Sequence, residues 1–493
     1  MAKFIGRNDL LEDLESLWRK RTSSIVACRG RRRIGKSTLI REFARRTAED
    51  YIEIEGLAPQ QERQMTNRDQ LENFMRVLSV HAGRDLGLVS DWQTAFARLD
   101  SVIDDAKRTV ILLDEISWMG SYDPNFPAIL RNAWETYFHR HDALVVVVCG
   151  SVSAWISKNI LGDTGFAGRF SRDYLIPELT LRECAQFWGE RLERVAAREI
   201  FDVLSVTGGV PRYLEEVDPG LSAEENVRRM CFLPNGELYR DFDSIFNPIF
   251  GKDVETKVEV LKSLANRPMT GTELAEELGE GRNGRFSALL KDLEEGGFIC
   301  PDQGKNPETG AESRIAKYRL RDNYTRFYLK YVLPHKDEIR RGAFKCVSLD
   351  LLPEWESVRG LQFENLIVNN SSDVIPHLGI GNSIVLSAAP YRNSRKSHGT
   401  TQRGVQIDLL VQTQTTAYVV EVKRKNHLGA EIEDEVRQKI SRLPLRKGVS
   451  ARPALVYDGE LAPSVVGRGF FDAIIPAWKL LGEAHVVAIA SNV

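Results

Sequence analysis

Eight residues near the amino end have the types and spacing of a phosphate-binding loop. Gly30 to Ser37 runs Gly-Arg-Arg-Arg-Ile-Gly-Lys-Ser and fits the pattern G-x-x-x-x-G-K-[ST] in full. The glycines would let backbone N–H groups surround phosphate oxygens, and a helix that starts here would add its free amino-terminal donors. Lys36 would reach the β- and γ-phosphates, and Ser37 would be a ligand of Mg²⁺.

An acidic pair supplies the second half of this chemistry. The apolar run Val110–Leu113 ends in Asp114 and Glu115. Asp114 would hold the Mg²⁺ shell, and Glu115 would polarise the attacking water. The alternative is a chance Gly-Lys-Ser loop together with an unrelated acidic strand end.

Three further positions could complete this site. Ser151 follows the apolar strand Val145–Cys149 and could touch the water or the γ-phosphate; the alternative is a simple strand-end serine. Arg169 follows a glycine-rich segment and could stabilise transition-state charge in a neighbouring subunit, or be a structural arginine. Pro211, in Gly-Gly-Val-Pro-Arg, would lie where a helical lid meets the nucleotide, or in an ordinary turn.

A second constellation lies near the carboxyl end. Asp408 lies in one apolar run, and Glu421 and Lys423 lie in the next, at a separation that suits a β-hairpin. Glu421 and Lys423 are two apart on a strand, so they project from the same face. The carboxylates would hold Mg²⁺, which activates water, and the lysine would stabilise developing charge. The alternative is an edge-strand salt bridge with Asp408 exposed.

Basic residues near this constellation favour a nucleic-acid partner. Arg392, Arg395, Lys396 and Arg403 occur in one stretch without an acid, and Lys423-Arg424-Lys425 and Arg446-Lys447 follow. Phosphate contacts from such residues would make binding depend on salt. A solvated, flexible loop is the alternative.

The elements that must position these residues alternate in the first part of the chain. Short β-branched runs, separated by helical segments, predict buried parallel strands. The predicted strands are Ser24–Cys28, Tyr51–Leu57, Thr109–Asp114 and Ala143–Cys149, with a helix over Ser37–Arg46. Helices over Leu181–Val195 and Ala197–Val206 follow.

The remaining chain predicts two further modules. Helices over Val258–Ala265, Thr270–Leu278 and Arg285–Glu295, followed by a polar excursion and a strand over Ala316–Leu320, have the order of a winged helix-turn-helix. Its third helix region carries both bases (Arg282, Arg285, Lys291) and acids, so we expect packing and switching rather than sequence-specific DNA binding. Predicted strands at Ser383–Ala388, Val405–Gln412, Thr416–Lys423 and Pro453–Tyr457 form the last module.

Several segments together resemble the archaeal-type P-loop ATPases, relatives of the STAND and AAA+ ATPases. These segments are Phe4–Arg7, the loop at Gly30–Ser37, Asp114–Met119, Cys149–Ser151 and Gly208–Pro211. The resemblance covers roughly residues 1–335, including the winged helix. It implies a nucleotide-controlled switch, with Ile5, Gly6 and Arg7 near the adenine.

The carboxyl-terminal pattern resembles the PD-(D/E)XK nuclease superfamily. Asp408 and then Glu421-Val422-Lys423 lie on successive strands, and Glu364 precedes them on a predicted helix. The resemblance covers about residues 355–460 and implies a metal-dependent nuclease fold. Gln438, on the following helix, matches a polar position of some such nucleases, or lies on a solvated helix face. A nuclease fold that binds without cutting is a further alternative.

Composition sets the broader limits. The chain has 493 residues, 67 Lys plus Arg against 69 Asp plus Glu, and a net charge of −2, which excludes a histone-like basic protein. Six scattered cysteines show no C-x-x-C spacing. The polar start without an apolar signal core leads us to expect a cytoplasmic protein without membrane spans.

The hypothesis is an α/β protein with a P-loop ATPase core (1–180), a helical lid (181–255), a winged helix (256–335) and a restriction-endonuclease-like domain (336–493). ATP would gate a Mg²⁺-dependent, or Mn²⁺-dependent, DNA nuclease, in defence against foreign DNA, and Arg169 predicts a homo-oligomer. The rivals are a STAND-like signalling or DNA-binding ATPase and a transcription regulator.

The predicted nucleotide-binding residues are Ile5, Gly6, Arg7, Gly30, Arg31, Arg32, Arg33, Ile34, Gly35, Lys36, Ser37, Thr38, Ser151 and Pro211. The predicted catalytic residues are Glu115, Arg169, Glu364, Asp408, Glu421 and Lys423, and the metal ligands are Ser37, Asp114, Asp408 and Glu421.

Overall fold

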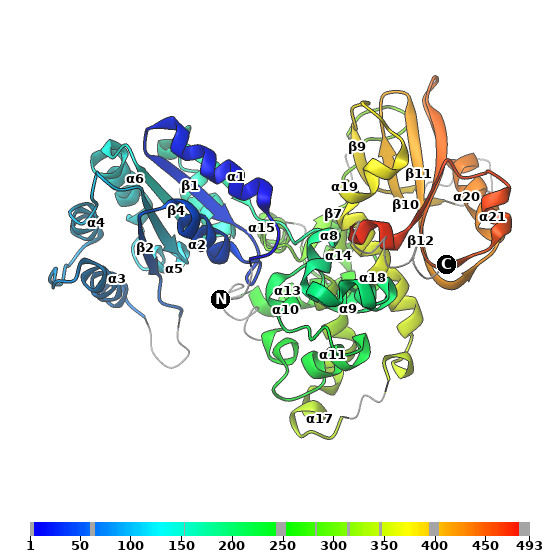
Figure 1. The fold of residues 1–493 in the computed structure, drawn as a ribbon, viewed down its shortest axis with the longest axis horizontal. Helices are drawn as coiled ribbons and strands as arrows, with labels where there is room; N and C mark the ends of the chain where they lie inside the picture. Colours follow the sequence, from blue (N-terminus) through cyan, green and yellow to red (C-terminus); the bar gives the residue numbers. More distant parts are fainter. Residues whose placement is uncertain are drawn as a thin grey trace. The chain divides into compact units, whose positions relative to one another are not determined.

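The computed structural model describes residues 4–59, 65–151, 153–242, 253–281, 283–312, 316–344, 348–393 and 404–482. The chain forms two compact units, the first chiefly Met1–Glu178 and the second chiefly Leu179–Asp243, Glu255–Leu290 and Phe298–Val493 (Figure 1). Four of the predicted basic residues lie outside the described residues: Arg282, Arg395, Lys396 and Arg403. Of the helices described, none is long and apolar enough to cross a membrane.

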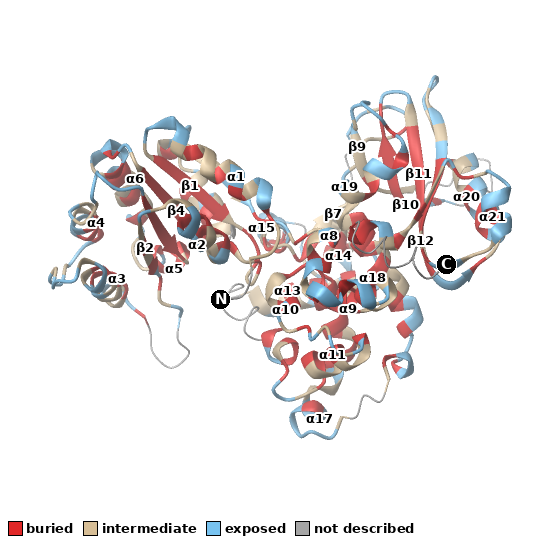
Figure 2. Ribbon diagram, in the orientation of Figure 1, coloured by how far each residue is buried: buried red, intermediate tan, exposed pale blue. Residues whose placement is uncertain are grey.

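A five-stranded parallel sheet forms the centre of the first unit. Its strands run in the order β2-β3-β4-β1-β5. They are β1 (Ser24–Arg29), β2 (Asp50–Glu55), β3 (Thr109–Asp114), β4 (Leu144–Gly150) and β5 (Phe170–Leu175). Every residue of β3 and β4 is buried, and β4 is drawn red in Figure 2; this burial explains why both strands are almost entirely apolar in sequence. The predicted parallel sheet is confirmed.

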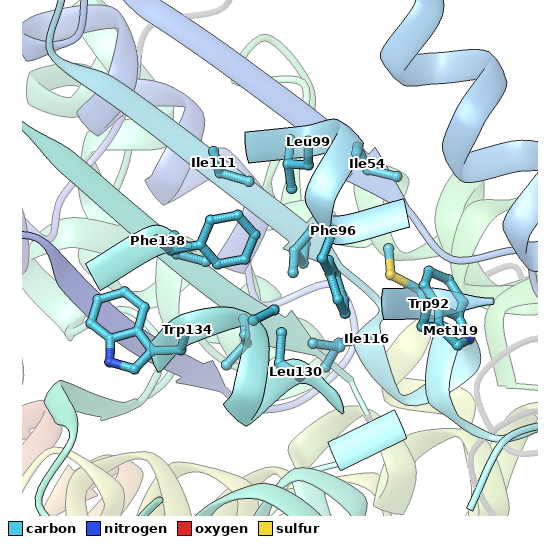
Figure 3. Packing of buried hydrophobic residues seen from close by; sticks show 14 of the residues in the cluster. Ile54, Trp92, Phe96, Leu99, Ile111, Ile116, Met119, Leu130, Trp134 and Phe138 are labelled. Atoms are coloured by element: carbon cyan, nitrogen blue, oxygen red, sulfur yellow. The ribbon is translucent and has the colours of Figure 1, made fainter. Parts of the chain in front are cut away.

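Helices cover both faces of this sheet. The helices of the first unit are α1 (Asn8–Ser16), α2 (Lys36–Thr47), α3 (Asn67–Ala82), α4 (Trp92–Asp100), α5 (Ile116–Gly120), α6 (Phe126–Thr136) and α7 (Ser153–Ile156). On one face Trp92 and Phe96 pack with Phe126 and Phe138 against Ile111 of β3 (Figure 3). On the other face Leu39 and Phe43 of α2 pack against β1 and β4. This two-sided burial fixes the carboxyl ends of the strands, where the acidic pair lies.

Short helices open the second unit. They are α8 (Leu181–Ala185), α9 (Ala197–Thr207), α10 (Pro211–Leu214) and α11 (Ala223–Cys231). The prediction of one helix over Leu181–Val195 is wrong: α8 continues as a 3₁₀ segment, Gln186–Arg194, and Gly189 interrupts it at φ 52°. Such a positive φ is open to glycine at low cost.

Three helices and a small antiparallel sheet follow. The helices are α13 (Val254–Asn266), α14 (Gly271–Glu277) and α15 (Gly284–Glu295), and the sheet has the order β6-β8-β7. Its strands are β6 (Met269–Thr270), β7 (Ile299–Pro301) and β8 (Lys317–Leu320). Thr270 caps α14 through a capping box with Glu273, which fixes the turn between β6 and the helix. After β8 come α16 (Asn323–Phe327) and α17 (Lys336–Arg340).

The carboxyl-terminal part is a mixed five-stranded sheet of order β13-β12-β11-β10-β9. Its strands are β9 (Ser387–Asn393), β10 (Val405–Gln412), β11 (Thr416–Leu428), β12 (Ser450–Leu461) and β13 (Ala473–Pro476). β10 and β11 form the predicted antiparallel hairpin, whereas β11, β12 and β13 are parallel. The strand predicted at Ser383–Ala388 instead begins at Ser387. The helices are α18 (Trp355–Asn369), α19 (Ser371–Val374), α20 (Glu431–Arg442) and α21 (Pro463–Gly467).

Candidate functional site

The phosphate-binding loop connects β1 to α2. Gly30 and Gly35 have φ values of 143° and 83°, and a Cβ at Gly30 would lie 2.9 Å from the carbonyl oxygen of Ile176. These two positions therefore require glycine. Lys36 Nζ donates to the carbonyl oxygens of Gly30 and Arg31, each at 3.0 Å, so its ammonium lies inside the loop.

The hydroxyl of Ser37 lies against the carboxylate of Asp114. Ser37 is in the first turn of α2, and its Oγ donates to Asp114 Oδ2 at 2.5 Å. The other carboxylate oxygen accepts the N–H of Glu115 at 2.9 Å. A hydroxyl and a carboxylate held together beside the loop are hard oxygen donors of the kind that Mg²⁺ binds. The residues predicted as metal ligands here are thus in contact.

Glu115 and Ser151 interact at the ends of neighbouring strands. Glu115 Oε2 accepts two hydrogen bonds from Ser151, one from its N–H at 3.1 Å and one from its hydroxyl at 2.9 Å. Glu115 has a left-handed backbone, φ 47°. A side chain at Gly56 would collide with this segment, because its Cβ would lie 2.7 Å from the Glu115 carbonyl oxygen. Glycine at position 56 therefore leaves room for the left-handed conformation of Glu115. Ser151 therefore orients the predicted catalytic carboxylate.

Arg7 connects the amino-terminal segment to this loop. Its Nη2 donates to the carbonyl oxygens of Ile34 at 2.5 Å and Pro177 at 3.1 Å. Arg7 is buried, and it precedes α1 with a left-handed backbone. These contacts bring Ile5, Gly6 and Arg7 next to the loop; their predicted position near an adenine stays a prediction.

Arg169 and Pro211 have defined surroundings. Arg169 forms an ion pair with Glu135 on α6, and about a third of its side chain is exposed. Pro211 is the first residue of α10, and the preceding Gly209 carbonyl accepts the N–H of Leu179 at 2.9 Å. Neither contact involves the phosphate loop, so the roles predicted for both residues stay predictions.

The carboxyl-terminal candidates come from two strands and one helix of the second unit. Asp408 lies on β10, Glu421 and Lys423 on β11, and Glu364 on α18. Asp408 Oδ2 accepts the N–H of Val422 at 2.9 Å, and Lys423 Nζ lies 2.8 Å from Glu421 Oε1. Asp408 and Glu421 are buried.

The three carboxyl groups raise one another's pKa. Burial raises the pKa of Asp408, and the charge of Glu364 raises it further. Burial likewise raises the pKa of Glu421, with a contribution from Asp408, and that of Glu364, with a contribution from Glu421. Carboxylates that disfavour one another's charge in a buried place form a candidate cation site.

Lys439 on α20 is a residue that the sequence analysis missed. Its Nζ lies 2.7 and 2.6 Å from the two Glu421 oxygens, whereas Gln438 is exposed, on the solvated helix face. A signal for Lys439 exists, because Ile432, Val436 and Lys439 are spaced four and three apart and share one helix face. Its charge lowers the pKa of Glu421 and so opposes the effect of burial.

The donor set has the chemistry that suits a divalent cation, but Glu421 is already paired with two lysines. Carboxylate oxygens are the ligands that Mg²⁺ and Mn²⁺ prefer. Across the residues that the structure describes, no three His, Cys, Asp or Glu side chains are gathered closely enough to hold a metal ion. A cation would therefore compete with Lys439 and Lys423 for Glu421.

Arg424 does not have the position that the sequence suggested. It belongs to the basic run after the strand, but it is buried, with Nη2 2.9 Å from Asp202 Oδ1 and Nε 3.0 Å from Asp458 Oδ2. The prediction that Arg424 contacts nucleic-acid phosphates is wrong, because two aspartates already neutralise it away from solvent. Lys425 and Lys447 are exposed.

Comparisons with known proteins concern the part of the chain that contains the phosphate-binding loop. Residues 4–217 match the family model of an ATPase domain found predominantly in Archaea. An uncharacterized protein of Methanocaldococcus jannaschii, MJECL04, is 22% identical over 367 residues, which cover 74% of this chain and 76% of the relative. The chain thus carries an archaeal-type ATPase domain, with an α/β fold and a parallel sheet.

Two solved structures are also similar in part. The Walker-type ATPase PABY2304 of Pyrococcus abyssi has a TM-score of 0.47 at 16% identity, with 66% of this chain and 96% of that chain covered. The ORC2 protein of Aeropyrum pernix, in ADPNP and ADP complexes, has a TM-score of 0.41 at 13% identity, with 69% and 95% covered.

Proposed function

We propose that the ATPase domain controls a metal-dependent nuclease site built from Glu364, Asp408, Glu421 and Lys423. The observation that carries the proposal is the grouping of three mutually destabilised carboxyl groups and two lysines on one mixed sheet. Buried like charges are costly unless a cation or a change of protonation compensates them.

The ATPase half of the proposal follows from the contacts around Lys36. The loop N–H groups and Lys36 bind the phosphates, and Ser37 and Asp114 hold the cation. Glu115, oriented by Ser151, takes part in positioning the attacking water. Bound Mg²⁺ would neutralise charge that develops on the phosphate oxygens.

The nuclease half assigns separate tasks to the carboxyl-terminal side chains. Asp408 and Glu421 hold the cation, and Glu364 completes its surroundings. Lys423 stabilises the charge that develops on the phosphodiester, while Lys439 releases Glu421 when the cation binds. Bound Mg²⁺ or Mn²⁺ would activate a water molecule and shield the phosphate. DNA is the substrate we infer, from exposed bases such as Lys425 and Lys447.

A packed helix supports communication between the two halves. Helix α9 lies within the stretch matched by the ATPase family model, and α18 carries Glu364. Gln362 Nε2 donates to the Ser205 carbonyl oxygen at 2.9 Å, and the rings of Phe201 and Phe363 meet edge to face at 5.2 Å. These contacts lie within the second unit, and through them a shift of α9 would move the helix that bears Glu364.

Cleavage of supercoiled plasmid tests the proposal. With Mg²⁺ or Mn²⁺ and each nucleotide state, wild type should cut, Asp408→Ala should not, and Lys36→Ala should lose its response to ATP. Asp408→Ala should keep ATP hydrolysis, because the two sites have no residue in common. Arg45→Ala, an exposed change on α2, is the control. A wild-type protein that cuts neither DNA nor RNA in any nucleotide state contradicts the proposal.

The second candidate function is a signalling ATPase whose carboxyl-terminal domain binds without cutting. The contacts of Lys423 and Lys439 with Glu421 favour it, because an acid already paired with lysines needs no cation. Unchanged DNA binding by Asp408→Ala, with no cleavage by wild type, would support this candidate.

A further inference from the structure

The excursion between β7 and β8 packs along the edge strand of the carboxyl-terminal sheet. We call residues 302–312 the strap. The N–H of Lys305 donates to Ser387 Oγ on β9 at 3.1 Å, and Gln412 Nε2 donates to the Lys305 carbonyl oxygen at 2.7 Å. Further along, the N–H of Arg446 donates to the Pro307 carbonyl oxygen at 3.2 Å. The predicted wing of the winged helix therefore contacts the same domain as Glu364, Asp408 and Glu421, which we call the acid cluster.

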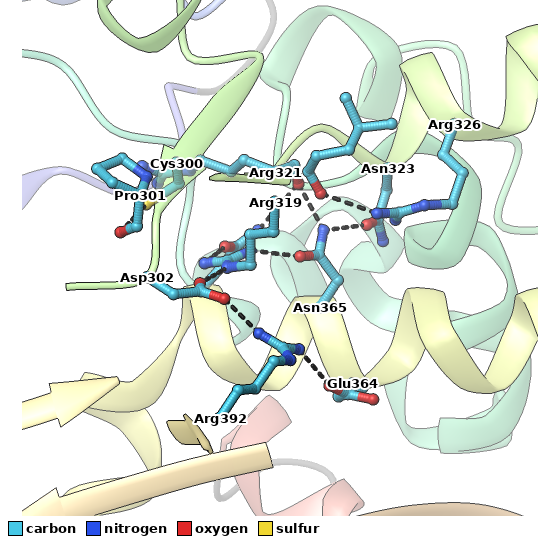
Figure 4. Close-up of polar contacts among 12 residues, drawn as sticks. Cys300, Pro301, Asp302, Arg319, Arg321, Asn323, Arg326, Glu364, Asn365 and Arg392 are labelled. Atoms are coloured by element: carbon cyan, nitrogen blue, oxygen red, sulfur yellow. Dashed lines mark hydrogen bonds and ion pairs between the residues drawn. The ribbon is translucent and has the colours of Figure 1, made fainter. Parts of the chain in front are cut away.

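Asp302 is the first residue of the strap and binds two arginines. It accepts from Arg319 Nε at 2.9 Å and from Arg392 Nη1, and only 6% of its side chain is exposed (Figure 4). Its N–H donates to the Lys317 carbonyl oxygen at 2.8 Å, which fixes the backbone at this point. A buried carboxylate with two guanidinium partners is held firmly in place.

Arg392 is shared unequally between Asp302 and Glu364. Its Nη1 is hydrogen-bonded to Asp302, whereas its Nη2 lies 3.9 Å from Glu364 Oε1, beyond hydrogen-bond distance. Arg319 holds the neighbouring helical turns, since its Nη1 and Nη2 donate to Asn365 and Asn369 of α18. The guanidinium of Arg392 is thus kept near Glu364 without being bonded to it.

We propose that Asp302 is a positioning residue for Glu364: it holds Arg392 back, so that the Glu364 carboxylate stays available to a divalent cation. Without the charge of Asp302, Arg392 would turn to its nearest remaining carboxylate, which is Glu364. The inference rests on the proposed function of the acid cluster. Asp302 directly follows β7, so it also connects the small β6-β8-β7 sheet to the acid cluster through Arg392.

Calorimetry with Mn²⁺ on the full chain tests this. Only the Mn²⁺ binding that Asp408→Ala abolishes is counted, because this excludes Mn²⁺ that binds at the ATPase site. Asp302→Asn, which keeps one acceptor oxygen, should weaken this binding about tenfold, the usual effect of losing a residue that orients a metal ligand. Adding Arg392→Gln to Asp302→Asn should restore most of the affinity, because the competing guanidinium is gone. Arg392→Gln alone should bind Mn²⁺ at least as tightly as wild type.

Glu308→Gln is the matched control, an exposed acid in the same strap, and should change nothing. A structural role for Asp302 would weaken the double variant as much as the single one, and that result overturns the inference while the proposed function stands. Asp302→Asn with wild-type affinity overturns it equally. Wild type without any Mn²⁺ binding that depends on Asp408 overturns the proposed function and the inference together.

Discussion

The phosphate-binding loop and the acid cluster hold their charged side chains with different kinds of partners. At the phosphate site, Lys36 lies inside its loop, Ser37 contacts Asp114, and Ser151 holds Glu115. At the acid cluster, lysines hold Glu421, and Arg392 stands beside Glu364.

This difference indicates where control can be exerted. A site whose donors already bond to one another needs only its ligand, because its geometry is fixed before binding. At the acid cluster, a cation would have to displace Lys423 and Lys439 from Glu421 before it could bind. On the function proposed above, this is the site at which a movement of α18 or of the strap would exert control.

The largest expected effect lies at the preassembled site. Glu115→Gln should lower ATP hydrolysis about 10²–10⁴-fold, the usual contribution of a catalytic base, while ATP still binds. Phosphate release and nucleotide titration measure the two separately. Loss of ATP binding together with hydrolysis would show that Glu115 is needed to build the site, and would break the comparison.

The stability of the carboxyl-terminal domain should depend on ion pairs between residues that are far apart in the sequence. Arg424→Met leaves Asp458 buried without its ion-pair partner and leaves the half-buried Asp202 with only its longer contact to Arg359, which should cost roughly 3–5 kcal/mol of unfolding free energy. Thermal and denaturant unfolding measure this loss. The exposed neighbour variant Lys425→Met should cost almost nothing, and equal losses in both would refute the claim.

Ser151→Ala should have an intermediate effect. It removes the hydroxyl hydrogen bond to the Glu115 carboxylate and leaves the one from the Ser151 N–H. A hydrogen bond to a charged group is worth about 1.5–3 kcal/mol, so the rate of hydrolysis should fall roughly 10- to 150-fold. A fall in kcat with little change in KM is the expected pattern, and unchanged kcat would remove Ser151 from the site.

The smallest effect concerns acid stability. The hydrogen bond from Arg172, aided by Tyr174, lowers the pKa of Asp13 to about 2. Because this value is below that of an unfolded aspartate, about 3.9, the stabilisation is present above that pH and lost as pH falls toward 2. Asp13→Asn should therefore be less stable than wild type at pH 6 and lose less stability on acidification. Melting temperatures from pH 6 to pH 2 check this.

The parts that sequence predicts well are those whose cause is local. The phosphate loop is contiguous, so its glycines and Lys36 are visible without any partner. The β10-β11 hairpin follows from two apolar runs at short separation, and it brings Asp408 and Glu421 onto neighbouring strands. In both cases chain connectivity alone places the groups.

The parts that sequence misses depend on distant partners. From the sequence alone Arg424 is expected to be an exposed base, because its partner Asp202 lies more than two hundred residues earlier in the chain. Asp302 and Arg392 are ninety residues apart, and no spacing rule connects them. Gly189 breaks a helix whose apolar pattern continues through it, because backbone conformation there does not follow hydrophobic spacing.

The strap has one more consequence, which concerns contacts between molecules. β9 is the outermost strand of its sheet, and an open strand edge is a template for pairing with another chain. Gly304 approaches β9 closely, since a Cβ there would lie 3.3 Å from both Ala389 and Ser387, and Lys305 and Glu312 pair with each other across the strap. These contacts are to the side chains of Ser387 and Ala389, which project from one face of β9, so the strap covers that face of the strand and would hinder another chain from packing there.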